Sequence, residues 1–183
     1  MNGSRHIIGS FNHGSMANAP PQAIGVQATD PDRQVVALCG DGGLAVPMGE
    51  LLTLRQLHLP VKAVIFNIAA LAFVELEMKE AGIVNYGTDL DNPDFAQVAQ
   101  AVGLFGARLE RCGELEKALS DAFAHPGAAV VDVRTTRQEL AIPPREPKGG
   151  KGLCPLRCPH PRVRRGDELI ELARSNLRQL DRE

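Results

Sequence analysis

Three short runs of apolar residues constrain the fold of this chain more than any other feature. They cover residues 35–39 (VVALC), 63–66 (AVIF) and 129–133 (AVVDV), the last apolar except for Asp132. Runs that stay apolar from one residue to the next, instead of alternating with polar residues, are typical of strands buried on both faces, as in parallel sheets. Helical patterns separate the runs, so we expect an α/β fold, a doubly wound parallel sheet with helices on both faces.

The other elements follow from spacing and from helix and strand breakers. Helical periodicity predicts helices over residues 15–27, 48–57, 94–102 and 114–124, and a short strand is expected over 107–109. Prolines and glycines crowd residues 144–166, where they disfavour both helix and strand. Residues 167–183 have apolar side chains at helical spacing. We therefore expect a single domain over 1–143 with a C-terminal tail, which consists of an extended segment over 144–166 and an amphipathic helix over 167–183.

The composition excludes several classes of protein. With 44% hydrophobic and 23% charged residues, the chain can build the core of a globular protein. Aromatic residues make up only 4% and Trp is absent, so we expect no stacking surface for nucleic acid. The longest apolar run, residues 68–74, is far shorter than the roughly 20 residues of a membrane-spanning helix, and no signal peptide is visible. Four scattered cysteines favour a reducing, cytoplasmic compartment.

The loop after the first strand carries the clearest chemical signal. It reads Gly40-Asp41-Gly42-Gly43, and ligands of open parallel sheets bind in such loops. Glycines let the backbone approach a phosphate, but the Asp41 carboxylate would repel one unless a cation lies between them. Asn67 ends the next strand, and adjacent strand ends can share one cation. The loop is therefore either a phosphate and cation site or a tight turn with a solvated aspartate.

Two further features are open to more than one interpretation. His13 lies in a glycine-rich loop over residues 9–21 and is either a catalytic group or a structural hydrogen-bonding group. Cys154 and Cys158 with His160 resemble part of a metal site, but their spacing is not a standard zinc pattern and no fourth ligand is evident.

Longer stretches of the sequence resemble a known family. Gly40-Asp41-Gly42, then 24 residues, then Asn67 is similar to the thiamine diphosphate motif. The runs GSFNHGSMANAPPQAIG, QVVALCGDGG, AFVELEMKEAG and ELAIPP resemble the C-terminal, diphosphate-binding domain of bacterial pyruvate dehydrogenase (quinone). That family is related to pyruvate oxidase and acetolactate synthase. The resemblance implies thiamine diphosphate and Mg²⁺ as cofactors of this domain.

The resemblance also assigns roles to individual residues. Gly14 would offer its carbonyl to the aminopyrimidine, Ser15 and Met16 would line that ring, and Met16 would wedge the cofactor into a bent shape. Asp41 and the Ala70 carbonyl would bind Mg²⁺, Gly42 and Gly43 would contact the diphosphate, and two residues, Phe73 and Glu77, would face the reacting centre as catalytic residues. The other wall of the cofactor site would consist of Ile68, Ala69, Ala70, Leu71, Ala72, Phe73 and Val74.

The sequence departs from the family at three places. Ile68 stands where the family has the second Asn of an Asn-Asn pair, which is its Mg²⁺ ligand. An apolar side chain supplies no oxygen, so we expect weakened Mg²⁺ binding. Ala72 replaces a glycine that lies close to the cofactor. The tail over 144–166 differs from the family's lipid-binding C-terminus, so the last helix, with Arg174 and Arg178, either contacts anionic lipid at the membrane periphery or packs as a solvated helix.

Two functions remain open at this point. The first is the diphosphate and Mg²⁺-binding part of a thiamine diphosphate-dependent pyruvate:quinone oxidoreductase, which decarboxylates pyruvate to acetate and CO₂. In that family FAD binds a separate domain, and a pyrimidine-binding domain, often on a second subunit, supplies an activating glutamate. Pyruvate and quinone would then be the reactants, and the protein would lie in the cytoplasm or at the inner face of the cell membrane. As an enzyme fragment, the chain is expected to be inert alone, because the pyrimidine-binding and FAD domains do not fit within its 183 residues. The second function is a non-catalytic module that acts only in binding or dimerisation.

Overall fold

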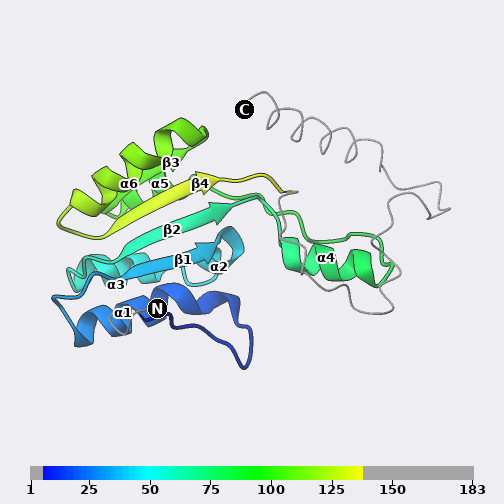
Figure 1. The fold of residues 1–183 in the computed structure, drawn as a ribbon, viewed down its shortest axis with the longest axis horizontal. Coiled ribbons are helices and arrows are strands. Elements are labelled where there is room, and N and C mark those ends of the chain that lie inside the picture. The colour runs from blue at the N-terminus through cyan, green and yellow to red at the C-terminus, as the bar shows by residue number, and fades with distance from the viewer. Residues whose placement is uncertain (1–5, 138–183) are drawn as a thin grey trace. The chain divides into compact units, whose positions relative to one another are not determined.

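The computed structural model describes residues 6–137, except for the side chains of residues 79 and 80. In these residues the strands are β1 (Val36–Gly40), β2 (Lys62–Asn67), β3 (Phe105–Leu109) and β4 (Ala129–Arg134). All neighbours pair in parallel, in the order β1-β2-β4-β3 (Figure 1). The expected parallel α/β sheet is therefore confirmed.

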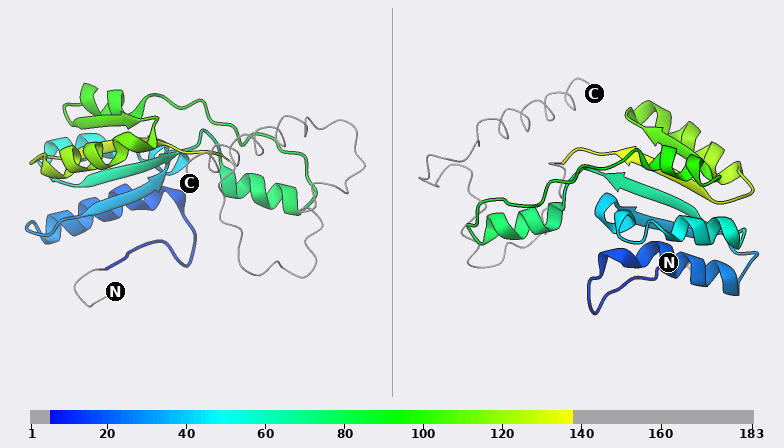
Figure 2. Two further views of the ribbon diagram at one scale, coloured as in Figure 1. Left: turned by 45° about the horizontal axis from the view of Figure 1, so that its top comes forward. Right: turned by 180° about the vertical axis from the view of Figure 1, so that it is seen from behind.

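Two apolar clusters show that helices cover both faces of this sheet (Figure 2). Side chains of a strand point alternately to opposite faces. Accordingly, Ile65 and Val130 pack with helices α1 (Ala19–Thr29), α3 (Glu50–Gln56) and α5 (Phe95–Ala101). The alternate residues Val64 and Val131 pack with α6 (Leu115–Ala124). The doubly wound arrangement is therefore present in the described part of the chain.

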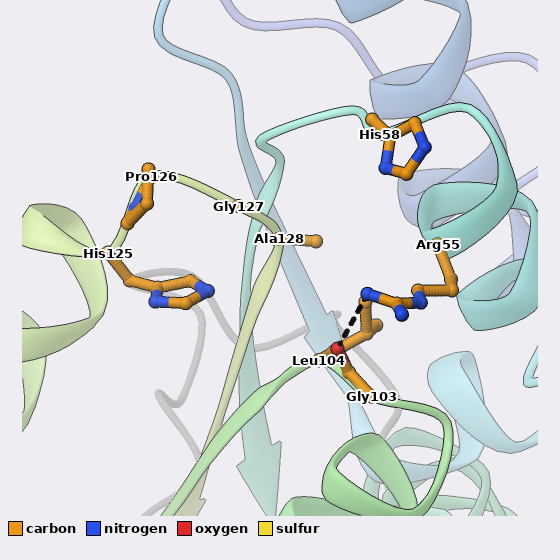
Figure 3. Close-up of a pocket in the computed structure, with 8 residues that line it drawn as sticks. All are labelled: Arg55, His58, Gly103, Leu104, His125, Pro126, Gly127 and Ala128. Atoms are coloured by element: carbon orange, nitrogen blue, oxygen red, sulfur yellow. Dashed lines mark hydrogen bonds between the residues drawn. The ribbon is translucent and has the colours of Figure 1, made fainter.

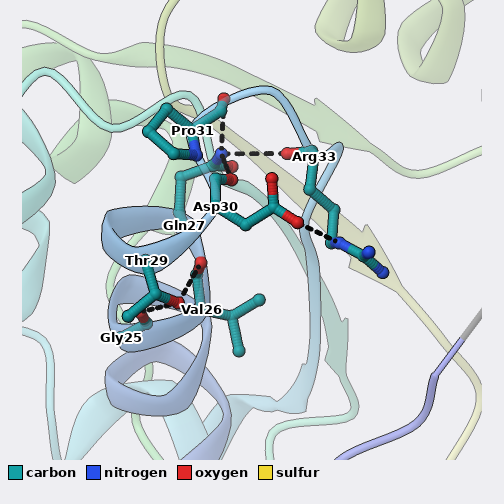
Figure 4. Close-up of polar contacts among 7 residues, drawn as sticks. All are labelled: Gly25, Val26, Gln27, Thr29, Asp30, Pro31 and Arg33. Atoms are coloured by element: carbon teal, nitrogen blue, oxygen red, sulfur yellow. Dashed lines mark hydrogen bonds and ion pairs between the residues drawn. The ribbon is translucent and has the colours of Figure 1, made fainter.

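Local sequence explains where the helices begin and end. Asp94 caps α5, because its side chain accepts a hydrogen bond from the Gln97 amide at 3.0 Å. Near the carboxyl end of α1, the buried Gln27 side chain donates hydrogen bonds to the carbonyl oxygens of Asp30, Pro31 and Arg33 (Figure 4). An ion pair between Asp30 and Arg33 lies in the same turn. These bonds fix the turn that leads into β1.

Some boundaries differ from those expected from the pattern. A short helix, α2 (Asp41–Ala45), begins directly at the glycine loop, which the sequence suggested to be only a loop. The first predicted helix is divided into a 3₁₀ turn, η1 (Met16–Asn18), and α1, because Pro20 and Pro21 suit the first turn of an α-helix. A second 3₁₀ turn, η2 (Cys112–Glu114), precedes α6, and β3 begins two residues before the predicted strand.

Residues 72–88 belong to a second compact unit, distinct from the unit that contains the sheet. Its helix is α4 (Ala72–Glu80), and Thr88 donates a hydrogen bond to the Asn85 side chain at 2.6 Å. The predicted segment over 144–166, the helix over 167–183 and the Cys154, Cys158 and His160 group lie outside the described residues. Within the described residues, none of the helices has the length and apolarity needed to cross a membrane.

Candidate cofactor site at the carboxyl ends of the strands

Three segments predicted to hold a cofactor meet where β1 and β2 end. A Cβ atom on Gly42 would lie only 2.9 Å from the Leu71 side chain, and one on Gly43 would lie 3.0 Å from the Met16 carbonyl oxygen. A Cβ on Gly43 would therefore press on the Met16 backbone, and one on Gly42 on the end of the Leu71 side chain, so glycine fits best where this loop meets the Met16 turn. This close approach of backbone segments is what a phosphate-bearing cofactor needs from a glycine loop.

The turn before Met16 is held by local hydrogen bonds. Gly14 has a φ of +58°, which glycine adopts without strain, and its amide donates to the Ser10 carbonyl at 2.8 Å. The Ser15 amide donates to the Ser10 hydroxyl at 3.3 Å. Gly14, Ser15 and Met16 are exposed. These three predicted ring-lining residues thus form one accessible turn beside the glycine loop.

Asp41 is buried at the start of α2, and its carboxylate oxygens accept three hydrogen bonds. One oxygen accepts from the Gly42 amide at 3.0 Å. The other accepts from the Ala69 amide and from the Asn92 side chain, each at 2.7 Å. Ala69 has a left-handed φ of 55°, which turns its amide toward Asp41. Asp41 therefore joins the ends of β1 and β2 through hydrogen bonds from protein groups.

A buried polar network extends from Asp41 across the sheet. The Asn92 amide nitrogen that binds Asp41 also donates to the Asn67 side-chain oxygen at 3.1 Å. That oxygen accepts a second bond from Arg134 at 2.9 Å, and the Asn67 nitrogen donates to Asp132 at 2.9 Å. Asn67 and Asp132 are fully buried. The sequence pattern identified Asp41 and Asn67 but not the other members, although Asp132 interrupts an apolar run and could have been noticed.

Burial sets the protonation of two groups near this network. Burial raises the pKa of Asp132, while the hydrogen bond from Asn67 and the charge of Arg108 act against that rise. Burial, followed by the negative charge of Asp41, raises the pKa of the Cys39 thiol to about 12. Cys39 is thus a buried, protonated thiol next to the candidate site.

The two cysteines in the described residues should therefore differ sharply in reactivity. Near pH 8 only about one Cys39 in ten thousand carries the nucleophilic thiolate, and the side chain is buried, whereas Cys112 is exposed. We expect iodoacetamide to modify Cys112 in the native chain at least about a hundredfold faster than Cys39. Peptide mass spectrometry measures both rates in one sample. The urea-unfolded chain is the control, in which both cysteines are accessible. Equal modification rates of Cys39 and Cys112 in the native chain would contradict the burial of Cys39.

The residues at the strand ends offer few free oxygen atoms to a magnesium ion. Ile68 supplies no oxygen, and the Asn67 oxygen is occupied by Asn92 and Arg134. The Asn92 amide nitrogen donates to oxygens of both Asp41 and Asn67 and so uses acceptors that a shared cation would need. In the part of the chain that the structure describes, no three His, Cys, Asp or Glu side chains gather as metal ligands. The predicted roles of Asp41 and the Ala70 carbonyl as metal ligands are untested, and weakened Mg²⁺ binding remains the expectation.

The remaining predicted residues lie on α4 or just before it. Ala70 pairs with Asp89 in an isolated antiparallel bridge, and Leu71 contacts the glycine loop as described above. Phe73, Val74 and Glu77 are exposed on α4 in the second unit, where Ala72 is buried. The catalytic roles of Phe73 and Glu77 therefore remain predictions.

Comparison with known proteins identifies the family. The family described as "Thiamine pyrophosphate enzyme, C-terminal TPP binding domain" matches residues 1–133. The "Putative thiamine pyrophosphate-containing protein YdaP" of Bacillus subtilis (strain 168) is 35% identical over 133 residues, which is 73% of this chain and 23% of that protein. The acetolactate synthase large subunit of Porphyra purpurea is 31% identical over 147 residues, 76% of this chain and 24% of that protein.

A third relative gives the same result. The acetolactate synthase isozyme 1 large subunit of Escherichia coli (strain K12) is 30% identical over 146 residues, 78% of this chain and 26% of that protein. The chain thus spans about a quarter of the length of these relatives. Its match to the family covers Met16, the glycine loop, Asn67 and the strands that position them. The chain belongs to the C-terminal, thiamine pyrophosphate-binding domain family of thiamine pyrophosphate enzymes.

Proposed function

We propose that this chain binds thiamine diphosphate at the carboxyl ends of β1 and β2, as one half of a cofactor site. The observation that carries the proposal is the junction of Met16, Leu71 and the glycine loop, where a Cβ on Gly43 would lie only 3.0 Å from the Met16 carbonyl oxygen. Membership of a thiamine pyrophosphate-binding family supports it.

The chain's own residues bind and orient the cofactor in this proposal. Gly14, Ser15 and Met16 hold the aminopyrimidine ring, and the backbone of Gly42 and Gly43 contacts the diphosphate. Thiamine diphosphate, when bound, supplies an electron sink for the decarboxylation of a 2-keto acid. The protein's part is to position that group, with a pyrimidine-binding domain or a second subunit completing the site.

For the whole protein, we propose oxidative decarboxylation of pyruvate to acetate and CO₂, with electrons passing through FAD on another domain to quinone. The sequence stretches around Met16, Asp41 and Phe73, which resemble pyruvate dehydrogenase (quinone), support this activity. An enzyme with this activity would lie in the cytoplasm, at the inner face of the cell membrane. Several relatives are named acetolactate synthase, so acetolactate formation is the alternative activity. Assay of the protein with its completing domain distinguishes the two, because only the first reduces an electron acceptor.

A second candidate function is a non-catalytic binding or dimerisation module. The observation that favours it is the strand-end network, in which Asn92 donates hydrogen bonds to Asp41 and Asn67 and Ile68 supplies no oxygen. A domain of this kind keeps the family fold without a metal-dependent cofactor.

Calorimetric titration of thiamine diphosphate with Mg²⁺ tests the proposal. We expect weak binding by the chain and binding at least about tenfold tighter by Ile68→Asn, because the variant adds a side-chain oxygen that can coordinate Mg²⁺; tenfold corresponds to about 1.4 kcal/mol. Ile68→Leu is the matched control, since it keeps the volume without adding an oxygen. The gain should disappear when EDTA removes Mg²⁺.

Each other outcome has a definite meaning. Equal affinity of the chain and Ile68→Asn would show that Ile68 does not limit metal binding. An absence of binding by the chain and both variants, all folded by circular dichroism, would overturn cofactor binding and favour the non-catalytic module.

A further inference from the structure

A small hollow lies at the amino ends of the strands, at the opposite edge of the sheet from the candidate cofactor site. Its volume is about 260 Å³, and loops that precede β2, β3 and β4 surround it. Leu104 and Ala128 are the buried apolar members of its wall. The residues that line it are Arg55, His58, Gly103, Leu104, His125, Pro126, Gly127 and Ala128.

Three nitrogen-bearing side chains face this hollow, and the lining contains no acidic residue. Figure 3 shows the Arg55 guanidinium and the His125 ring pointing toward each other from opposite sides, with His58 beside Arg55. Arg55 uses one nitrogen in a long bond of 3.4 Å to the Gly103 carbonyl. Within residues 6–137 its other donors make no hydrogen bond or ion pair, so they are available to a ligand.

Two glycines provide the space in which these side chains lie. A Cβ on Gly103 would be 3.3 Å from the Arg55 guanidinium carbon, and Gly103 has a φ of +79°. A Cβ on Gly127 would be 3.2 Å from the His125 Nε2 atom. Both side chains therefore rest directly against backbone, which limits their movement and directs their polar ends into the hollow.

The surrounding structure holds His125 in place. Lys62, only 4% exposed, donates to the carbonyl oxygens of His125 and Gly127, each at 2.6 Å. The His125 ring lies against Phe105, with ring centroids 5.4 Å apart. His58 has a φ of 53°, a left-handed conformation that a residue with a side chain adopts at some cost. His125 is thus fixed in advance, which reduces the entropy lost on binding at this side of the hollow, whereas Arg55 and His58 are exposed.

We propose that this hollow is an anion site that takes a phosphate group, either as free phosphate or as the end of a small phosphate ester. The planar guanidinium of Arg55 can form two parallel hydrogen bonds to phosphate oxygens, and the two imidazoles can donate to the remaining ones. No carboxylate of the lining opposes a negative charge. The volume suits a small ligand, and the site is separate from the proposed thiamine diphosphate site.

Titration of the ¹⁵N-labelled chain with inorganic phosphate and with ribose 5-phosphate, followed by NMR, tests this site. We expect saturable shifts of the backbone amides of residues 55–58, 103–104, 125, 127 and 128. Arg55→Met should weaken binding about tenfold or more, and Arg55→Lys should also weaken it because lysine lacks the planar fork. Arg111→Met is the matched control, since Arg111 is an exposed arginine away from the hollow that pairs with Glu114.

The possible results distinguish free phosphate from a phosphate ester, and specific binding from a general effect of salt. Tighter binding of ribose 5-phosphate than of phosphate identifies an ester as the ligand, and the reverse identifies free phosphate; both support the site. Linear, non-saturating shifts, equal shifts with sodium chloride, or equal binding by Arg55→Met and Arg111→Met overturn it. Native spectra of each variant confirm that loss of binding is not loss of fold. Thiamine diphosphate binding should be unchanged in Arg55→Met, so this test is independent of the proposed function.

Discussion

Replacing Gly106 with alanine is expected to lower the free energy of unfolding by about 3 kcal/mol. Gly106 lies in β3 against α5, where a Cβ atom would overlap the Ala96 carbonyl oxygen and lie 3.0 Å from the Ala96 Cα. Backbone cannot move aside as the end of a side chain can, so the strand and helix must separate. The separation would also weaken the bond from the Gln100 side chain to the Gly106 carbonyl, now 2.8 Å long.

Thermal and urea unfolding measure this effect. For a chain of this size, 3 kcal/mol corresponds to a fall in Tm of roughly 6–12 °C. Gly113→Ala is the control, because a Cβ there would meet no atom within 4 Å. If both variants unfolded within about 0.5 kcal/mol of the natural chain, the close packing of α5 on β3 would be wrong.

Replacing Asn67 with leucine should cost about 2–4 kcal/mol of stability. Asn67 is fully buried and joins Asp132, Arg134 and Asn92 through hydrogen bonds of 2.9–3.1 Å. Leucine has a similar size but no polar atoms, so the buried Asp132 carboxylate would lose its amide donor. Urea unfolding at neutral pH measures the loss.

The pH dependence of this variant follows from the protonation of Asp132. Burial raises its pKa above the ordinary 3.8. A carboxyl with a raised pKa stabilises the fold below its unfolded pKa, and this contribution is lost as the pH rises through its folded pKa. Because Asn67→Leu removes a bond that lowers this pKa, part of the lost stability should return as the pH falls from 7 toward 4. Asp132→Asn in the same background should abolish the recovery, and a loss that is independent of pH would contradict the buried carboxylate.

The strands were the most predictable part of the fold. Residues 35–39 and 63–66 are apolar throughout, and residues 129–133 are apolar except for Asp132, as is typical of strands in a parallel sheet. Strand β4 is mostly buried, whereas Val36 and Leu38 of β1 are exposed. Helix starts were less predictable, because α2 begins at a loop of Asp41 and glycines whose intrinsic helix propensity is low. Packing of Leu44, which is fully buried, stabilises that helix instead.

The candidate site also has residues that the sequence predicts and residues that only the folded structure brings together. Its glycines and Asp41 follow from the motif, since their types and spacing are written in the chain. Asn92 could not be found in this way, because it lies 51 residues from Asp41 and contacts it only in the folded chain. The hollow with Arg55 and His125 is likewise made by segments that are distant in sequence.

The sequence by itself determined the parallel α/β class, the family and the residues of the glycine loop, because periodicity, residue type and spacing are local properties. Only the tertiary structure decided that Asn92 takes the position between Asp41 and Asn67, and that three basic side chains gather at the opposite edge of the sheet. The physical reason is that a hydrogen bond or a cluster of charges depends on distances between atoms, and folding brings together residues that no sequence pattern links.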